Sequence, residues 1–216
     1  MKSPRRRRGL AFGLVLASCA AAGGCGAAAA WYVGLFASNG RFDGLDACAL
    51  FPPEKDIAAL VRNPAREPID SRPKPLLGGW SGGNLRSECK WSSVPKGQDE
   101  PFRTVRVHTE TMKRSGRTSA EERARLSLES WYRARAARRD TDARPIGVGE
   151  QGYANTDTMR ADLVFLRVTV YDLHVKFRVS NGLIDVSART HSRPSTKEWD
   201  LLVDLARKVE ANVRSS

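Results

Sequence analysis

The first candidate for chemistry in this chain is a serine inside a glycine-rich run. Gly79-Trp80-Ser81-Gly82-Gly83 matches the Gly-x-Ser-x-Gly pattern, in which a nucleophilic serine lies on a sharp turn between a strand and a helix. Pro73 and Pro75 precede the run, and the residues that follow lack a helical pattern, so the required context is missing. We therefore expect no catalysis and keep a serine hydrolase acting through Ser81 as the alternative.

Metal-ligand chemistry is the next candidate, and the spacing of ligand-type residues does not favour it. The three histidines are spread over expected strands and strand ends: His108, His174 and His191. His174 would share the polar face of a strand with Lys176 and Arg178, whose charges repel a cation. Three aspartates lack the spacing of a calcium loop: Asp140, Asp142 and Asp157. No phosphate-binding glycine loop is present, so we expect neither a metal nor a cofactor, and solvated surface histidines.

A row of arginines on one expected helix is the third candidate. The helix covers residues 119–138, and its polar face carries five arginines: Arg123, Arg125, Arg133, Arg135 and Arg138. Such a face attracts anionic lipid headgroups or an anionic polymer. Glutamates of the same helix partly neutralise it, so an ordinary solvated face is the other interpretation; they are Glu121, Glu122 and Glu129.

The N-terminus has the pattern of an export and membrane-anchoring segment. Residues 1–8 are basic, with four consecutive arginines, and residues 9–37 form a long uncharged apolar run. A membrane-spanning helix needs about 20 apolar residues. Because cytoplasmic flanks are rich in Arg and Lys, we expect residues 1–8 in the cytoplasm, a single transmembrane signal-anchor over 9–37 and the remaining chain outside the cell membrane. Nucleic acid is therefore not an expected partner.

Two other fates of this segment would also export the rest of the chain. Leu16-Ala17-Ser18-Cys19 resembles the lipobox of bacterial lipoproteins, in which Cys19 would be lipidated and become the new N-terminus. Against this, the chain stays apolar well beyond Cys19, where mature lipoproteins usually continue with a polar tether. Cleavage of a signal near the alanine run 27–30 is the third alternative.

Cysteine placement predicts one structural disulfide. Cys19 and Cys25 lie in the apolar run, whereas Cys48 and Cys89 lie in the exported part, where an oxidising environment favours pairing. A bridge between Cys48 and Cys89 would close a loop of about forty residues and contribute roughly 4 kcal/mol to stability on the loop-entropy model. The Cys-x-x-Cys spacing of a redox site is absent.

Length and composition bound the exported part. The chain has 216 residues, of which 41% are hydrophobic and 28% charged, which suits one folded domain and excludes a disordered chain. No internal repeat or second long apolar run is present, which excludes a solenoid and a polytopic membrane protein, and the length excludes a TIM barrel. The chain has 36 Lys and Arg residues and 24 Asp and Glu residues, which gives a formal net charge of +12 at pH 7. We expect a linker over 38–46 and an extracytoplasmic domain over 47–214.

Hydrophobic periodicity and helix-cap signals predict an α+β fold for this domain. In chain order we expect these elements: a short helix over 52–61 with proline in its first turn, an irregular proline-rich stretch over 62–87, strands from Cys89 and over 102–110, a helix over 119–138, a strand over 162–170, a hairpin at Asn181-Gly182 and a helix over 195–213. Ser119 with Glu122 and Ser195 with Glu198 match the capping-box pattern at the start of the two long helices. This order suggests an antiparallel sheet covered by helices.

The hairpin is the clearest local signal, because Asn181-Gly182 favours a two-residue type I′ turn. That turn places three apolar pairs on one face: Val179 with Ile184, Phe177 with Val186, and Val175 with Ala188. On the other face Arg178 would pair with Asp185, and Lys176 would be exposed. The apolar face should pack on the apolar stripe of the last helix, which comprises Trp199, Leu202, Ala206, Val209 and Val213.

Four short motifs resemble a known family. They are Asp46-Ala-Cys48-Ala-Leu50, Cys89-Lys-Trp91, Ile146-Gly-Val-Gly149-Glu-Gln-Gly-Tyr153 and the closing amphipathic helix 195–213. Over residues 43–214 the chain resembles the domain-of-unknown-function 3558 family of exported, membrane-attached proteins from high-GC Gram-positive bacteria. The resemblance implies a fold similar to the Mog1/PsbP-like α/β/α sandwich, and it implies no catalytic residues. Many members resemble lipoproteins at the N-terminus, from which this chain departs through its long apolar run.

Together these patterns predict a membrane-anchored extracytoplasmic interaction or sensory module of the bacterial cell envelope. The alternatives are an envelope serine hydrolase using Ser81 and a purely structural envelope protein. The expected partners are the membrane and either an envelope polymer or another envelope protein, with no nucleic acid and no metal.

Overall fold

The structure covers five stretches of the chain. The computed structural model describes residues 37–75, 83–93, 103–138, 141–163 and 166–216. The predicted cytoplasmic segment 1–8, Cys19, and the predicted transmembrane segment 9–37 apart from Ala37 lie outside the described residues. Among the helices of the described stretches, none is both long and apolar enough to span a membrane.

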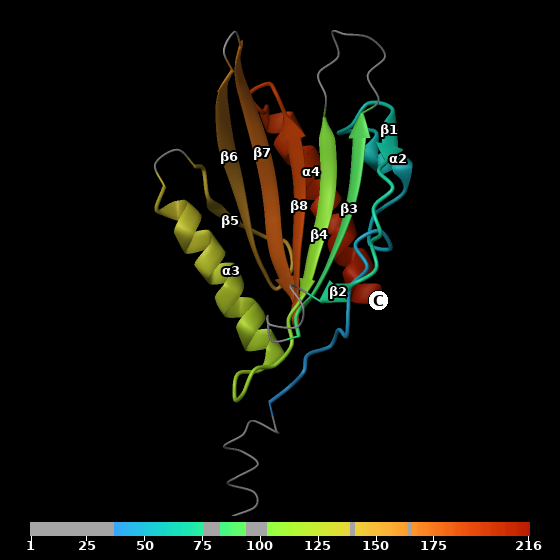
Figure 1. The fold of residues 1–216 in the computed structure, drawn as a ribbon, viewed down its shortest axis with the longest axis vertical. Coiled ribbons are helices and arrows are strands. Elements are labelled where there is room, and N and C mark those ends of the chain that lie inside the picture. The colour runs from blue at the N-terminus through green and yellow to red at the C-terminus, as the bar shows by residue number, and fades with distance from the viewer. Residues whose placement is uncertain (1–36, 76–82, 94–102, 139–140, 164–165) are drawn as a thin grey trace, which may run out of the picture.

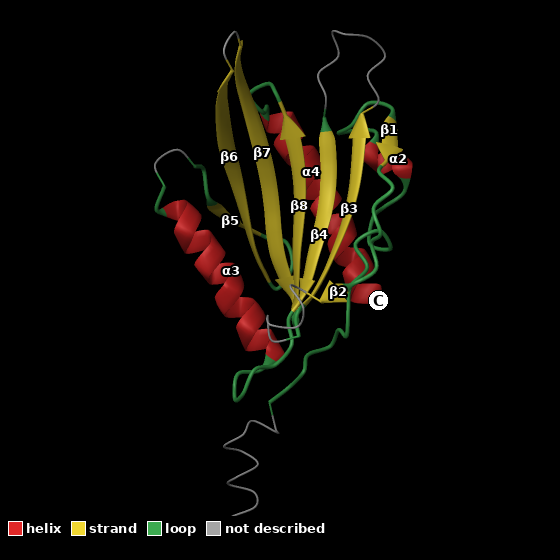
Figure 2. Cartoon of the chain, in the orientation of Figure 1, coloured by secondary structure: helices red, strands yellow, loops and turns green. Residues whose placement is uncertain are grey.

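The chain forms an α+β fold built on one large antiparallel sheet (Figures 1 and 2). The described strands are β1 (Pro64–Arg66), β2 (Lys74–Pro75), β3 (Leu85–Ser93), β4 (Thr104–Thr111), β5 (Arg144–Ile146), β6 (Gln151–Leu163), β7 (Leu166–Val179) and β8 (Gly182–Thr190). The described helices are α2 (Glu54–Ile57), α3 (Ala120–Ala136) and α4 (Thr196–Ser215). The strand order is β1-β3-β4-β8-β7-β6-β5, with β2 paired to β3. The predicted class, an antiparallel sheet with helices, is confirmed.

α4 covers one face of the sheet and encloses the main core. Ser195 and Glu198 form the predicted capping box, in which each side chain accepts a hydrogen bond from the other residue's N–H. The predicted apolar stripe is buried, and Leu205 adds to it; the buried residues are Trp199, Leu202, Leu205, Ala206, Val209 and Val213. These residues share one core cluster with Phe177, Ile184 and their apolar neighbours on β7 and β8. The predicted packing of the hairpin on the last helix is therefore confirmed.

α3 lies on the opposite face of the sheet and covers only part of it. Ser119 caps the helix by accepting a hydrogen bond from the Glu122 N–H at 3.2 Å. Ala124 and Leu128 form a small second core with residues of the sheet side, Met112 and Leu183. α3 contacts β6, β7 and β8. In Figure 1, α3 lies beside β5 and β6 while α4 passes behind the sheet, so no described helix covers β3 and β4 on the α3 side.

The β7–β8 hairpin differs from the predicted register by two residues. The turn is Ser180-Asn181 rather than Asn181-Gly182, and Phe177 consequently pairs with Ile184. Ser180 takes the left-handed conformation at the turn, with φ +51°. Strand side chains alternate with period two, so a shift of two residues keeps the same side chains on the core face. The predicted faces are thus correct although the predicted partners are not.

The side chain of Asn181 gives the reason for this shift. Asn181 is fully buried; its Oδ1 accepts from the Phe42 N–H, and its Nδ2 donates to the carbonyl oxygens of Phe42 and Met112, each at 2.9 Å. The next residue, Gly182, already belongs to β8 and lies against Leu45, where a Cβ would approach the Leu45 side chain to 2.7 Å. Contacts with distant segments therefore decide the position of the turn.

The shift also changes the polar face of the hairpin. The predicted ion pair between Arg178 and Asp185 is wrong: Arg178 pairs with Glu150 at 2.6 Å, and Asp185 contacts His174 at 3.1 Å. The predicted exposure of Lys176 is also wrong, because this side chain lies half-buried under α3. Docking of α3 on this face buries residues that a bare hairpin would leave in solvent.

The segment 38–46 is part of the folded domain rather than a free linker. Phe42 and Leu45 are buried in the main core. The Leu45 N–H donates to the Thr111 hydroxyl oxygen at 3.2 Å, and the Thr109 hydroxyl donates to the Leu45 carbonyl oxygen at 2.8 Å. The predicted boundary at residue 47 is therefore too late.

Other element boundaries differ where the apolar pattern is weak. The predicted helix 52–61 is the shorter α2, which begins after both prolines. The stretch 62–87 contains β1, β2 and the start of β3, and the predicted strand 162–170 is divided between β6 and β7. The sequence does not predict β5 or most of β6. Tyr153, Asn155 and Asp157 alternate along β6 with Ala154 and small polar residues, so neither face has the apolar pattern by which strands are recognised.

Candidate functional site

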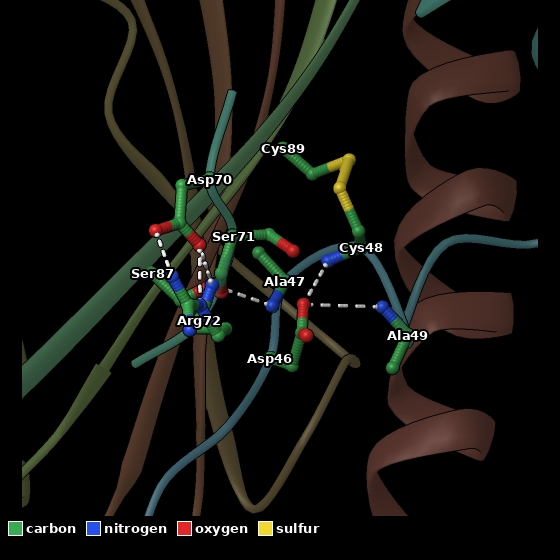
Figure 3. The surroundings of a disulfide bond; sticks show 9 residues. All are labelled: Asp46, Ala47, Cys48, Ala49, Asp70, Ser71, Arg72, Ser87 and Cys89. Atoms are coloured by element: carbon green, nitrogen blue, oxygen red, sulfur yellow. Dashed lines mark hydrogen bonds and ion pairs between the residues drawn. A yellow bond between two sulfur atoms is a disulfide. The ribbon is translucent and has the colours of Figure 1, made fainter. Parts of the chain in front are cut away.

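The predicted disulfide joins the N-terminal segment to the sheet. Cys48 and Cys89 are bonded, with their Cα atoms 5.0 Å apart. Figure 3 shows that Asp46 supports the bridge: its carboxylate accepts from the Cys48 N–H at 2.8 Å and from the Ala49 N–H at 3.4 Å. The Ala47 N–H donates to Ser87 Oγ on β3 at 2.8 Å. Cys89 is 1% exposed and Cys48 is partly buried, so the bridge lies against the main core.

Ser81 lies outside the described residues, and only the end of its glycine-rich run is described. Gly83 takes φ +79°, and the chain then enters β3 at Leu85. A strand follows the run, whereas a nucleophile elbow is followed by a helix. This flank gives no support to Ser81 as a nucleophile.

The five arginines predicted for an anionic contact do not form a common patch. Arg125 is held between Glu122 and Glu129 at 2.7 and 2.6 Å. Arg133 also pairs with Glu129, at 3.4 Å. Because these guanidinium groups already have carboxylate partners within the helix, the solvated-face interpretation describes this part of α3 better.

The other three arginines of the predicted helix, of which Arg138 lies beyond the end of α3, turn toward other parts of the domain. Arg123 donates to the Lys113 carbonyl oxygen. Arg135 and Arg138 approach Asp157 on β6, at 3.4 and 3.7 Å. The prediction that Arg135 lies on the face of the helix away from the sheet is therefore wrong.

Charged and polar side chains form a regular array on the α3 side of the sheet. Antiparallel register places residues of five adjacent strands in one row: Glu88, His108, Asp185, Lys176 and Tyr153. The next row comprises Lys90, Arg106, Ser187, His174 and Asn155. A shallow groove of about 130 Å³ crosses the part of this array that α3 leaves open. The lining of this groove contains several titratable side chains and is mostly polar.

His174 and Asp185 are the most buried charged pair of this array, each 9% exposed. His174 Nδ1 lies 3.1 Å from Asp185 Oδ1, and its Nε2 lies 3.9 Å from Asp157 Oδ2. Trp131 of α3 packs edge-on against the imidazole, with ring centroids 6.5 Å apart. The expectation of a solvated surface histidine is therefore wrong for His174.

Burial and charge act in opposite directions on the pKa of His174. Burial alone lowers it, but the charge and hydrogen bond of Asp185, with the charges of Asp157 and Asp172, raise the pKa above its ordinary value of 6.5. For Asp185 the directions are reversed: burial raises the pKa of the carboxyl, but the charges of His174 and Lys176 and the hydrogen bond from His174 hold it well below its ordinary value of 3.8. The two groups therefore stabilise each other as an ion pair.

Two neighbours of this pair respond mainly to burial. The pKa of His108 is lowered because burial disfavours its charged form, despite the attraction of Asp185. The pKa of Lys176 is lowered for the same reason. The pKa values of His108 and His174 therefore shift in opposite directions from the same ordinary value.

Ser187, His174 and Asp185 have the residue types of a hydrolytic triad but not its geometry. Asp185 contacts Nδ1 of the imidazole as the acid of a triad does. The other nitrogen, Nε2, faces β6, whereas Ser187 lies on β8 on the other side of β7. Ser187 Oγ accepts instead from Arg106 Nε at 3.3 Å. The proton path from serine to histidine that a triad needs is therefore missing from this array.

A few polar atoms between α3 and β6 have no hydrogen-bond partner among the described residues. They include both side-chain polar atoms of Asn155, with Asp157 Oδ1 and Arg135 Nε. Tyr153, on the same face of β6 as Asn155, stacks on Tyr132 of α3 with ring centroids 4.0 Å apart. Buried amides in such places are usually met by internal water.

A larger cleft, of about 430 Å³, lies on the other side of the sheet, and we call it the α4 cleft. Its volume falls in the range of small-ligand sites. α4 begins only at Thr196, so one end of the β6–β7 pair extends past the helix. On this end of the sheet, beyond the core residues Ala154 and Leu173, the side chains that face the cleft are polar. The lining residues are Asp142, Thr156, Thr158, Arg160, Tyr171, Arg193, Pro194 and Trp199.

Most polar groups of the α4 cleft are free to bind a ligand. Within the described part of the chain, Arg160 and Arg193 have neither an ion pair nor a hydrogen bond, and the hydroxyls of Thr156, Thr158 and Tyr171 have no hydrogen bond. The acid of the cleft is different. Asp142 is paired with the Arg144 guanidinium at 2.8 Å, and that guanidinium lies 5.2 Å from the ring centroid of Trp199.

Sequence reasoning found neither the α4 cleft nor the buried pair on the α3 side. A signal for the polar array was present, because Arg86, Glu88 and Lys90 alternate with buried residues along β3, as do Arg106 and His108 along β4. This alternation predicts a polar face but not its partial burial under α3. The cleft has no comparable local signal, since its residues come from separate segments.

Comparison with protein-family models, curated proteins and solved structures finds no match for this chain. The resemblance of residues 43–214 to the domain-of-unknown-function 3558 family therefore stays a sequence-based prediction.

Proposed function

We propose that this chain is a membrane-attached module outside the cell that recognises a component of the bacterial cell envelope and catalyses no reaction. The observation that carries the proposal is the α4 cleft, which combines a volume of about 430 Å³ with the unpartnered Arg160 and Arg193 and an apolar wall at Trp199. Such a combination suits binding, because the cleft supplies positioned polar groups without a nucleophile and base in contact.

The placement of the cleft supports this role. In Figure 1 the first described residues lie at one end of the domain, and α4 begins at the other end. If residues 9–37 are the membrane anchor, the cleft faces away from the membrane. An envelope component would then reach it without approaching the lipid surface.

The proposal includes the family and finer fold suggested by the sequence, a Mog1/PsbP-like sandwich of the domain-of-unknown-function 3558 family. Helices on both faces of an antiparallel sheet support it. So does the structural role of the motif residues. Cys48 and Cys89 bond two motifs together, and Gly149 has φ +71° at a position where a Cβ would lie 2.6 Å from the Arg178 carbonyl oxygen.

The experiment is site-specific photocrosslinking in intact cells expressing the full chain. A photoreactive residue replaces Asp142 in the lining of the cleft or, as the control, Arg66 on β1 at the opposite edge of the sheet. We expect a covalent product with envelope material from position 142 and none from position 66. Equal products from both positions, or none from either, would show that the cleft is not the recognition site.

Two further measurements test the membrane orientation and the absence of catalysis. A reporter that fluoresces only in the cytoplasm, fused after Ser216, should stay dark. A serine-reactive probe should not label the protein. Labelling that Ser81→Ala abolishes would establish the hydrolase alternative instead.

A further inference from the structure

We infer that the α4 cleft binds a sugar that carries a phosphate or carboxylate group. This inference rests on the proposed recognition role of the cleft and adds the chemical class of its ligand. Three properties of the cleft lead to it: an excess of unpaired positive charge, a row of free hydroxyls and an apolar wall.

The charge of the cleft selects an anion. Arg160 on β6 and Arg193, between β8 and α4, contribute a guanidinium from two separate segments. Asp142 is the carboxylate of the lining, and Arg144 already neutralises it at 2.8 Å. The planar fork of an arginine matches phosphate and carboxylate oxygens in a bidentate manner. Two such forks without partners among the described residues therefore favour a ligand with a phosphate or carboxylate group.

The free hydroxyls of the cleft favour a ligand that carries further hydrogen-bonding groups besides its anionic group. Thr156 and Thr158 stand two residues apart on one face of β6, and Tyr171 pairs with Thr158 across the sheet. Each hydroxyl both donates and accepts hydrogen bonds. A bare phosphate bound by the arginines would leave this row unused. The hydroxyls of a sugar, which also donate and accept, would complement it.

The remaining wall is apolar and fixed in place. Trp199 belongs to the main core, is 9% exposed and has the guanidinium of Arg144 at 5.2 Å from its ring centroid, so only a small part of the ring lines the cleft. Pro194 continues this wall beside Arg193. A sugar ring has apolar C–H groups as well as hydroxyls, so it can meet this wall and the polar row at once. A fully polar anion could not.

The test is calorimetric titration of the intact protein, purified in detergent micelles, with four probes: glucose 6-phosphate, glucuronate, glucose and inorganic phosphate. We expect the two charged sugars to bind at least about tenfold more tightly than glucose or phosphate, because only they engage both sets of groups. Arg160→Ala and Arg193→Ala should each weaken charged-sugar binding by about tenfold or more. Arg66→Ala removes the same charge from an exposed position at the far edge of the sheet and should have no effect.

Three outcomes would overturn the inference. They are equal affinity for glucose and its phosphate, no measurable binding of either charged sugar, and equal effects of Arg160→Ala and Arg66→Ala. Loss of heat in a variant that has unfolded is recognised by its circular dichroism spectrum. Thr158→Val then provides a second folded variant, in which charged sugars should bind more weakly and phosphate unchanged; unchanged affinity for the charged sugars counts against the inference.

The source of the sugar and the envelope role are decided separately. A uronate oligosaccharide that binds more tightly than glucuronate indicates a polymer, and equal affinity indicates a free monosaccharide; both support the ligand class. Binding in micelles without crosslinking from position 142 in cells would reject the envelope role but keep the ligand class. Crosslinking without charged-sugar binding would reject only the ligand class.

Discussion

Asn181 and Phe42 form a reciprocal hydrogen-bonded pair between residues 139 positions apart. The side-chain carbonyl oxygen of Asn181 accepts from the Phe42 N–H, and the side-chain amide nitrogen donates to the Phe42 carbonyl oxygen, both at 2.9 Å. The same amide nitrogen lies 2.9 Å from the carbonyl oxygen of Met112. One buried side chain thus joins the start of the domain, the end of β4 and the β7–β8 turn.

Removing this amide should destabilise the fold strongly. Asn181→Ala leaves the N–H of Phe42 and the carbonyl oxygens of Asn39, Phe42 and Met112 without this partner, and we expect a loss of about 2–4 kcal/mol in the free energy of unfolding. Urea denaturation measures it. The control is Asn212→Ala, because Asn212 donates a single hydrogen bond, to the Leu50 carbonyl oxygen at 3.0 Å, and should cost about 1 kcal/mol. Equal losses would mean that the pair with Phe42 contributes little.

The disulfide should contribute to stability without determining secondary structure. Cys48 and Cys89 are 41 positions apart, and opening a loop of that size should lower the free energy of unfolding by about 4 kcal/mol. Denaturation with and without dithiothreitol measures this loss. The double variant Cys48→Ala/Cys89→Ala should resemble the reduced protein and be insensitive to dithiothreitol. A thiol assay that finds both cysteines free in protein isolated without reductant would contradict the prediction.

The two histidines of the polar array should give opposite pH dependence. The pKa of His174 is raised, so its contribution to stability is complete below pH 6.5 and is lost as pH rises through the raised value. His108 has a lowered pKa, so its neutral form is favoured and stability is lost as pH falls below 6.5. The lowered pKa of Asp185 adds stability above pH 3.8 that is lost on further acidification.

Single substitutions separate these contributions. His174→Gln should cost more stability at about pH 5 than at about pH 9, whereas His108→Gln should remove part of the loss seen on acidification. Proton NMR titration of the full chain should place the His174 pKa above that of His108. The reverse order would show that the ion pair with Asp185 does not survive in solution.

Substitutions on the two faces of β7 should cost different amounts of stability. The difference should be smaller than in a sheet with one face fully in solvent, because α3 partly covers the polar face. Phe177 is fully buried in the main core, and Phe177→Ala should cost about 3–5 kcal/mol. The Nζ of Lys176 lies 5.3 Å from the Trp131 ring centroid, so Lys176→Ala should cost about 1 kcal/mol in the free energy of unfolding. The exposed Lys197 of α4 is the control and should cost less than about 0.5 kcal/mol. Equal losses at Lys176 and Lys197 would place Lys176 outside the contact with α3.

The glycines of the turn between β5 and β6 should not be equivalent. Gly149 has φ +71°, and a Cβ there would lie 2.6 Å from the Arg178 carbonyl oxygen. Gly149→Ala should therefore cost about 1–3 kcal/mol or more. A Cβ on Gly147 would meet no described atom within 4 Å, so Gly147 should tolerate alanine. Thermal denaturation of both variants measures the difference, and a stable Gly149→Ala would argue against this turn.

Local patterns in the sequence are sufficient to predict the two long helices and the faces of the hairpin. Ser119 and Ser195 cap α3 and α4 as predicted, because a cap and an apolar stripe involve residues within one or two helical turns. Phe177 and Ile184 are predictable as core residues because side chains of a strand alternate with period two. The pairing of Cys48 with Cys89 follows from their being the two cysteines beyond the apolar run.

Only the tertiary structure decided the register, the burial of the polar face and the presence of a cleft. Period two cannot distinguish registers that differ by two residues, and the residue that decides between them, Asn181, has its partner Phe42 at the other end of the domain. His174 is buried because α3 docks over β7, which no pattern within β7 encodes. The α4 cleft exists because the helix begins at Thr196 while β6 and β7 continue past it. Each of these features depends on where separate elements meet, and a periodic pattern within one element carries no information about that position.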